Sequence, residues 1–244
     1  MSRGNFNFKE LKTYFQTHLF DEYGVALHFK DIAGGIPADP ALVVKWINTM
    51  CKAKSDADRE AIVKSTIEDL DEKTDEKALA NWVVFKKDAA TGRYYLEGRC
   101  IKSALKEAAN IVKDIVGVRN FKSVMADRVF VKEEKIFFKV NGEFVTGELE
   151  FVERPVQVMT RQGHRSSVKR TDIIRNCTLE FTLQRIATFE VPEKALACVL
   201  TYLVELGCGS YRAQGHGKMN DVECVRTFTV EKETEKPEKK QKAA

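Results

Sequence analysis

The sequence predicts a single α+β domain that contains an antiparallel sheet. Residues 176–183 alternate between apolar and polar side chains, which is typical of a strand with one buried face. This pattern lies within 173–186, which is followed by an amphipathic helix over 192–206 and a further strand over 222–230. Helical and extended segments are therefore mixed along one chain, and we expect one domain to occupy residues 1–230.

The first half of the chain supplies a strand, a capped helix and a charged insertion. Residues 25–29 predict the first strand, after an aromatic-rich segment over 1–24 that hints at a short amphipathic helix. Asp39 followed by Pro40 marks the start of a helix, because aspartate caps a free N–H group and proline fits the first helical turn. Residues 55–86 are heavily charged and predict a helical insertion in the domain.

The clearest helix covers residues 99–115, directly after a short strand over 93–97. Its apolar residues recur at spacings of four and three, at Ile101, Leu105, Ala108, Val112 and Ile115. Further on, 128–132 and 136–140 predict two strands that pair with each other around a charged turn. The last segment, 231–244, is charged and has no apolar periodicity, so we expect it to be disordered.

Composition limits the class of protein. The 244 residues are 43% hydrophobic and carry a net charge of +4. No apolar run approaches the roughly 20 residues of a membrane span, and the N-terminus lacks the apolar core of a secretory signal. We therefore expect a cytoplasmic protein, of a bacterium or a phage-infected host cell, without a membrane partner. None of the six cysteines forms a C-x-x-C pair, which predicts structural thiols and neither a metal nor another cofactor.

A glycine-rich segment over 207–218 is the strongest candidate for a binding loop. Glycines permit positive φ angles and exposed N–H groups that can cradle phosphate, and the interleaved cations and aromatic ring add charge and stacking. A helix C-cap followed by a long turn is the alternative. The segment is not a Walker loop, because it lacks the G-K-[ST] ending and precedes a strand. Its candidate residues are Gly207, Gly209, Tyr211, Arg212, Gly215, His216, Gly217 and Lys218.

A basic segment over 154–170 is the second candidate. It contains five Lys or Arg residues, one histidine and no acidic residue. Charge of one sign, interleaved with short polar side chains, suits contacts to phosphates and 2′-hydroxyl groups. An exposed, solvated hairpin loop is the alternative. The candidate residues here are Arg161, His164, Arg165, Lys169 and Arg170.

A third segment, 97–106, ends a strand at a glycine and opens a helix with Arg99 and Lys102. Cations are unfavourable for the N-terminus of a helix, whereas an anion is stabilised there. The two basic side chains therefore indicate a bound anion. The alternative is that their aliphatic stems cover the apolar face of an amphipathic helix.

Candidates for catalysis are weak. The four histidines occur in no H-x-x-H or H-E-x-x-H motif, and the chain has no G-x-S-x-G motif. His28, on the first strand, and His216, in the glycine-rich segment, are the two residues that could act as general base in a metal-independent cleavage of RNA. A role in the core or in a loop is the better interpretation of each, so the sequence favours a protein that is not an enzyme.

Three stretches of the chain resemble the RAMP (repeat-associated mysterious protein) superfamily of CRISPR-associated RNA-binding and RNA-processing proteins. They are 94–109, 154–170 and 192–228, in this order. Residues 24–230 also look like a phage and prophage protein family with the same glycine-rich ending. The RAMP resemblance implies a ferredoxin-like (RRM-related) fold with the glycine-rich loop near bound RNA. The chain departs from the superfamily in its insertion over 55–86 and in lacking a convincing N-terminal catalytic histidine, which speaks against RNA cleavage.

Together these features predict a non-catalytic nucleic-acid-binding protein of phage or CRISPR-like origin. Single-stranded RNA is favoured over DNA as the partner, and the basic and glycine-rich segments are expected to contact its phosphates. Self-association along a strand, or assembly with other protein subunits, is compatible with this role. The alternatives are a metal-independent endoribonuclease and a phage structural or interaction protein without a nucleic-acid role.

Overall fold

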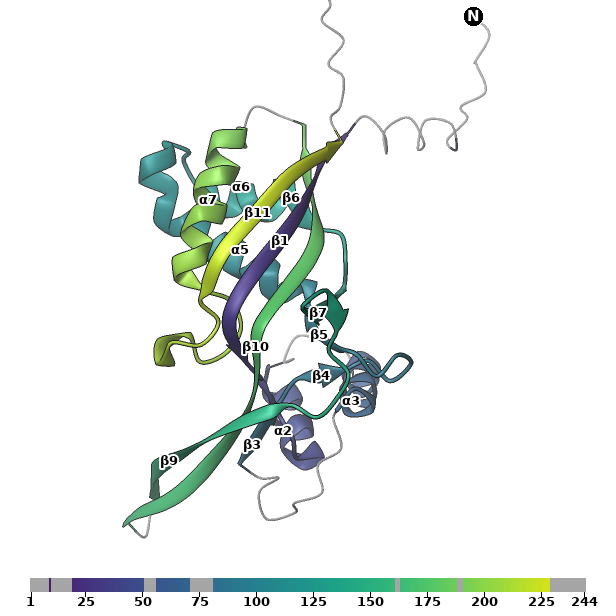
Figure 1. Ribbon diagram of the computed structural model, residues 1–244, viewed down its shortest axis with the longest axis vertical. Helices are drawn as coiled ribbons and strands as arrows, with labels where there is room; N and C mark the ends of the chain where they lie inside the picture. The colour runs from purple at the N-terminus through teal and green to yellow at the C-terminus, as the bar shows by residue number, and fades with distance from the viewer. Residues whose placement is uncertain are drawn as a thin grey trace, which may run out of the picture.

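A computed structural model describes residues 9, 19–50, 56–70, 81–160, 163–187 and 191–228 (Figure 1). The tail over 231–244 lies outside the described residues. The short helix expected within 1–24 also lies largely outside the described residues, which include only 9 and 19–24 of that segment. Residues 20–24 are the beginning of the first strand. In the described part of the chain, no helix has the length and apolar character needed to cross a bilayer.

Three long strands form the centre of the sheet. β1 (Phe20–Ala33) lies between β10 (Gly163–Ile186) and β11 (Met219–Phe228) and is antiparallel to both. The alternating segment 176–183 and the last predicted strand therefore belong to one antiparallel sheet, and the predicted α+β class is confirmed. β1 buries every second side chain in the main core, at Tyr23, Val25, Leu27 and Phe29.

The sheet continues on the other side of β10. Its path runs β11-β1-β10-β7-β5-β4, and every step is antiparallel. β3 also joins β10, through a short parallel pairing. The remaining strands are β2 (Ile36–Pro37), β3 (Trp82–Val84), β4 (Lys86–Lys87), β5 (Tyr94–Glu97), β6 (Val129–Val131), β7 (Lys135–Val140), β8 (Glu143–Phe144) and β9 (Glu150–Thr160).

Helices α5 (Gly98–Val116), α6 (Phe121–Arg128) and α7 (Glu193–Leu206) gather beside the β11, β1 and β10 strands (Figure 1). α5 packs on α7, and both bury apolar side chains in the core that they share with the sheet. The predicted apolar face of α5 is buried at Ile101, Leu105, Ala108 and Val112. Ile115 is 80% exposed, and at this end of α5 the neighbouring Val116 packs against the core instead.

A second group of helices consists of α2 (Pro40–Met50) and α3 (Asp56–Glu68), which contact each other. The predicted cap of α2 is present, since the N–H group of Ala41 donates to Oδ1 of Asp39 over 2.8 Å. A 3₁₀ turn, η1 (Arg212–Gln214), lies in the glycine-rich segment.

The end of the predicted charged helix is extended instead. Residues 82–87 form β3 and β4, and the helix in the described part of 55–86 is α3. Trp82, Val83 and Val84 are all buried. A short apolar run that is buried on both faces is typical of a strand inside a sheet, and here tertiary contacts decide the conformation.

β6 and β7 do not form the predicted hairpin. Both pair with β10, β6 opposite residues 183–185 and β7 opposite 177–179, so they follow each other along one edge. Between them, the carboxylate of Glu133 accepts a hydrogen bond of 2.8 Å from the N–H group of Thr182. A side chain thus replaces the missing backbone partner, and the charged segment is an interruption of a strand and not a turn.

The basic segment forms a ribbon. β9 and β10 make a long two-stranded hairpin, from Glu150 opposite Ile173 to Thr160 opposite Gly163, which projects from the body (Figure 1). Beyond it β10 enters the sheet. Asn176, with φ 49°, lies close to this transition and adopts the left-handed conformation that asparagine tolerates better than most residues.

A buried ion pair joins the far ends of the long strands. The guanidinium of Arg185 donates to Asp21 over 2.5 Å and to the carbonyl oxygen of Val191 over 2.9 Å. Only 7% of the Arg185 side chain and 4% of the Asp21 side chain are exposed. The pair therefore connects β1, β10 and the segment before α7 where water is excluded.

We expect Arg185→Ala to lower the free energy of unfolding by about 3–5 kcal/mol, because it leaves Asp21 buried without its nearest cation. Urea denaturation measures this loss. Arg175→Ala is the control, since Arg175 pairs with Glu150 on the surface and such pairs contribute about 0–1 kcal/mol. Equal losses in the two variants would show that the buried pair has no special role.

Candidate nucleic-acid interface

The glycine-rich loop is a closed structure that is attached to the end of β1. The N–H group of Cys208 donates to the carbonyl of Gly217 over 2.9 Å, and this contact joins the two limbs of the loop. The N–H group of Gly217 donates to the carbonyl of Asp31 over 3.0 Å. An isolated bridge between Ala33 and Ser210 fixes the loop to β1 a second time.

Packing explains three of the four glycines in this loop. A Cβ atom on Gly217 would lie 1.9 Å from the carbonyl oxygen of Cys208, and one on Gly207 would lie 2.6 Å from that of Gly217. A Cβ on Gly209 would meet Ile32 at 3.1 Å, whereas one on Gly215 would meet nothing within 4 Å. All four glycines have positive φ angles. The close crossing of the limbs therefore requires glycine before any ligand is considered.

Six of the twelve N–H groups in the segment expected to cradle phosphate have backbone partners inside the protein. Those of residues 207, 208 and 214–217 all donate to backbone carbonyls of the chain. The loop therefore has fewer N–H groups to offer a phosphate than its glycines suggest, and its side chains lie on the side of the hairpin and on the side of α5.

The base of the hairpin contacts the loop. The guanidinium of Arg154 donates to Oε1 of Gln214 over 2.7 Å and to Nε2 of His216 over 2.9 Å. The ammonium of Lys169 lies 4.6 Å from the ring centroid of Tyr211, which is a cation–π contact. We call these five residues the hairpin–loop junction. It joins two segments that the sequence singled out separately, and Arg154 and Gln214 are members that sequence reasoning did not select.

The junction fixes the tautomer of His216. Because arginine can only donate, Nε2 of His216 accepts, and the proton therefore lies on Nδ1, which is 2.8 Å from Oδ1 of Asp31. The other histidine considered for catalysis, His28, has Nδ1 3.0 Å from the hydroxyl of Thr178 and Nε2 3.4 Å from Glu223. Both nitrogens of His216 thus have hydrogen-bond partners, which does not favour a role as general base, whereas Nε2 of His28 is buried without a hydrogen bond and has only the nearby carboxylate of Glu223.

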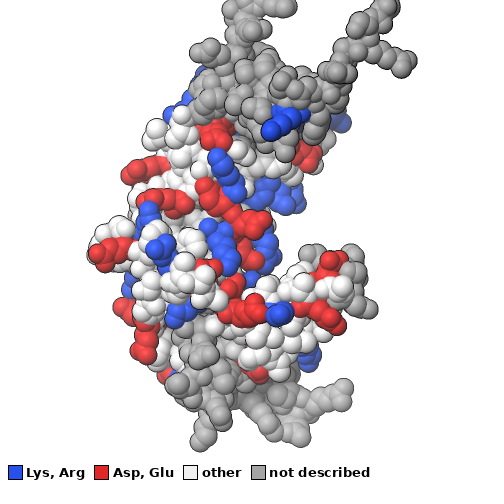
Figure 2. Space-filling model, turned by 90° about the vertical axis from the view of Figure 1, so that its right-hand side faces the viewer, with Lys and Arg blue, Asp and Glu red and all other residues white. Residues whose placement is uncertain are grey.

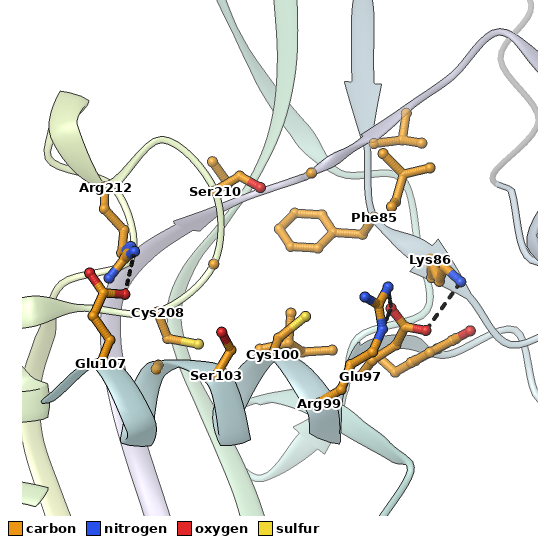
Figure 3. Close-up of a pocket in the computed structure, with 18 residues that line it drawn as sticks. Phe85, Lys86, Glu97, Arg99, Cys100, Ser103, Glu107, Cys208, Ser210 and Arg212 are labelled. Carbon is orange, nitrogen blue, oxygen red and sulfur yellow. Dashed lines mark hydrogen bonds and ion pairs between the residues drawn. The ribbon is translucent and has the colours of Figure 1, made fainter. Parts of the chain in front are cut away.

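A cavity of about 290 Å³ lies on the other side of the loop (Figure 3). The first turns of α5 form its floor, the segment 84–86 and β5 form one wall, and the loop forms the other. It thereby brings the predicted third segment to the glycine-rich loop. The side chains labelled around it in Figure 3 are Phe85, Lys86, Glu97, Arg99, Cys100, Ser103, Glu107, Cys208, Ser210 and Arg212.

Carboxylates balance the cations at this cavity. Glu97 binds Arg99 at 2.5 Å and Lys86 at 3.4 Å, and Glu107 accepts from Arg212 over 2.8 Å. Burial alone would raise the pKa of Glu97, but the hydrogen bonds and charges of Arg99 and Lys86 hold it below its ordinary value. Two ion-paired groups therefore stand at opposite ends of the cavity.

The other predicted cations lie apart from the cavity. Lys102 donates to the carbonyl of Met125 over 2.8 Å and lies over the ring of Phe130. Arg170 donates to Glu153, and Lys218 is 3.8 Å from Glu205. Arg161 is outside the described residues, and the side chains of His164 and Arg165 are outside the described part of the hairpin.

Charges of both signs alternate over the face that Figure 2 shows. Ion pairs account for part of this, including Lys135 with Asp88 and Lys139 with Glu180. No broad basic area covers this face in the described part of the chain. Basic charge without intervening acid is instead a property of the hairpin segment 154–170.

The thiols and carboxylates show no arrangement for a metal. In the described ranges, no three His, Cys, Asp or Glu side chains are placed to hold an ion together. Cys177 and Cys208 are buried as free thiols, and burial raises the pKa of each to about 12. These two cysteines are therefore protonated and pack as small apolar side chains.

No family model matches the chain, and no curated protein matches it. Among solved structures, it is similar to a chain of the type III-B Cmr-beta complex bound to cognate target RNA, with 12% identity and a TM-score of 0.48. That match covers 90% of this chain, which spans 65% of the length of the other. A chain of a type IV-B CRISPR complex is similar with 11% identity and a TM-score of 0.44, over 86% of this chain and 92% of that one. Likenesses of this degree carry no functional argument, so the function is inferred from the geometry of the site.

We expect Gly217→Ala to destabilise the protein more than Gly215→Ala. Both substitutions place alanine at a positive φ angle, which costs about 1–2 kcal/mol. Gly217→Ala adds the collision with the carbonyl of Cys208, whereas the space around Gly215 is open. Thermal or urea denaturation compares the two variants. Equal losses of stability would contradict the close crossing of the loop limbs.

The half-buried Lys102 predicts a pH dependence of stability. Burial, aided by repulsion from Lys106, lowers its pKa to about 8. Between pH 8 and the ordinary value of 10.5 the unfolded chain binds more protons here than the folded chain, so this lysine makes stability rise with pH in that window. We expect Lys102→Met to remove that rise in urea titrations, and the exposed control Lys113→Met to keep it. Parallel profiles for Lys102→Met and the parent would contradict the buried ammonium.

Proposed function

We propose that this protein binds nucleic acid without cleaving it, with single-stranded RNA as the favoured partner, in a CRISPR-like or phage context. The observation that carries the proposal is the hairpin–loop junction. It connects the hairpin, whose segment 154–170 carries no acidic residue, to the cations and the aromatic ring of the glycine-rich loop. Cations and a stacking face along one continuous surface are what a sequence-independent single-strand binder requires.

The topology supports a ferredoxin-like (RRM-related), RAMP-like domain as the scaffold. Along the chain, β1, α5, β7, β10, α7 and β11 succeed one another as strand, helix, strand, strand, helix and strand. The four strands lie in the order β11-β1-β10-β7. In this interpretation α2, α3, the shorter strands and the β9–β10 hairpin are additions to the scaffold.

The charges on the open face of the sheet favour a position of the RNA at the hairpin–loop junction. On the face of β1, β10 and β11 opposite the core, Glu22, Glu180 and Glu223 are partly or fully exposed, and Glu133 lies beside them. RRM domains stack bases on aromatic residues of their sheet. Glu22 and Glu180 pair with Lys132 and Lys139, so this face carries no excess of positive charge to attract phosphate, and we place the RNA along the hairpin and the loop.

The edge of the sheet leaves room for protein partners. β11 ends the path of the described strands, and Val225 on it is 65% exposed. Unpaired backbone groups along an edge strand are available for pairing with another chain. This supports self-association along the bound strand or assembly with other subunits as part of the proposal.

The test is a titration of single-stranded RNA at several salt concentrations. The expected phosphate contacts are Arg161, Arg165, Lys169, Arg170, Arg212 and Lys218. If all six engage, a log–log plot of the binding constant against salt concentration has a slope of roughly −4, at about −0.7 for each contact. The double variant Arg165→Ala, Lys169→Ala should reduce the magnitude of that slope by about 1.4 and weaken binding to all sequences alike.

Lys113→Ala removes one exposed cation from the far end of α5 and serves as the control, with an unchanged slope. Recovery of the labelled RNA at full length separates binding from cleavage. A double variant that binds as tightly as the parent at every salt concentration would exclude the basic ribbon from the interface. A parent protein that binds no RNA would favour the interaction-protein alternative.

A further inference from the structure

The cavity beside the glycine-rich loop combines an apolar interior with polar groups that lack partners. Phe85 and Leu96 line the interior, and Figure 3 shows Phe85 pointing into the space. The hydroxyls of Ser103, from α5, and Ser210, from the loop, face it from two sides (Figure 3). Within the described residues neither hydroxyl makes a hydrogen bond. Ser103 is exposed to water, whereas Ser210 is half-buried, so the hydroxyl of Ser210 loses free energy unless water or a ligand satisfies it.

The approach of Ser210 to this space depends on a glycine. A Cβ on Gly35 would lie 2.3 Å from the hydroxyl oxygen of Ser210, so any other residue there would displace that side chain. Gly35 is itself held, because its N–H group donates to the carbonyl of Val84 over 3.1 Å. The backbone around Gly35, which is bonded to Val84, therefore determines where the hydroxyl of Ser210 lies at the cavity.

The size and the ends of the cavity restrict the ligand. A volume of about 290 Å³ is at the lower end of ligand pockets, which suits one ring system and excludes an extended molecule. Arg99 stands at one end and Arg212 at the other, each shared with a carboxylate (Figure 3). A flat ring with donors and acceptors on its edge, flanked by negative charge on both sides, fits this arrangement.

We propose that the cavity holds the base of a single nucleotide, unstacked from the bound strand. This inference rests on the proposed function. The ring lies against the apolar interior, and its polar edge exchanges hydrogen bonds with Ser103 and Ser210. Phosphates on either side of the extruded nucleotide approach Arg99 and Arg212. Unstacking costs a few kcal/mol and is offset by stacking and hydrogen bonding in a fitted pocket.

A base in this pocket has two sources, a nucleotide within a strand or a free nucleotide. The ion pairs favour a nucleotide within an RNA strand over a free nucleotide. Each arginine is already neutralised by Glu97 or Glu107, so a single phosphate gains little by displacing one carboxylate. A strand held along the hairpin brings its phosphates to both ends at a high local concentration, which offsets the weak individual contacts.

The experiment uses oligoadenosine RNA that carries one 2-aminopurine, whose fluorescence is quenched by stacking on the neighbouring adenines and rises when the base is unstacked. We expect the parent protein to raise this fluorescence. Ser103→Leu fills the mouth of the cavity from an exposed position of α5 and should abolish the rise, while anisotropy still detects bound RNA. Ser103→Ala and Ser210→Ala should each weaken binding about 3- to 10-fold, the effect of one neutral hydrogen bond. Ser123→Leu, on an exposed position of α6, is the matched control with unchanged fluorescence.

The outcomes separate the two proposals. If the parent binds no RNA by anisotropy, the proposed function fails. If it binds RNA but gives no fluorescence rise, or if Ser103→Leu leaves the rise intact, the cavity inference alone is overturned. A further titration uses free 2-aminopurine riboside monophosphate. Saturation at a lower concentration than for the RNA would show that the cavity takes a soluble nucleotide and overturn the placement of a base from the strand.

Discussion

The end of β1 holds the candidate site together. The carbonyl of Asp31 accepts from Gly217, its carboxylate contacts His216, and Ala33 bridges to Ser210. Beyond it, the N–H group of Gly34 donates to the carbonyl of Asp172 over 2.9 Å. The loop, the hairpin and the cavity wall therefore all take their positions from a few residues of one strand. At this end, β1 pairs with β10 on one side, while the loop takes the place of β11 on the other, so the loop is bound directly to the sheet.

Local periodicity was sufficient to predict the elements with one buried face. The spacing of Ile101, Leu105, Ala108 and Val112 and the alternation around Leu179 identify α5 and β10 because burial selects every third or fourth residue, or every second. The strands over 82–87 and the pairing of β6 and β7 with β10 depend on contacts between distant segments. No local pattern shows that a glutamate side chain will fill a gap in a ladder, as Glu133 does.

The candidate site shows the same division. Residue types predicted which segments carry cations, glycines and an aromatic ring, and the structure places two of those segments in contact. The carboxylate that pairs with Arg99 is Glu97, a neighbour in the sequence. The carboxylate that pairs with Arg212 is Glu107, which is 105 residues away in the chain and could not be foreseen. The glycines were interpreted through their N–H groups, whereas the crossing of the loop limbs accounts for Gly207 and Gly217, and the approach to Ile32 of β1 accounts for Gly209. A cavity has no signature in a sequence, because it is the space that several elements leave between them.

The single strand β10 links the tip of the hairpin to the far end of the sheet. With 24 residues at about 3.3 Å each, it extends over roughly 80 Å along its own path. The hairpin projects from the domain and is anchored by β10, and the backbone near Asn176 lies where β10 enters the sheet. Because Ile174 and Cys177, which flank Asn176, are buried in the core, the direction in which the hairpin leaves the domain is tied to the packing of that core.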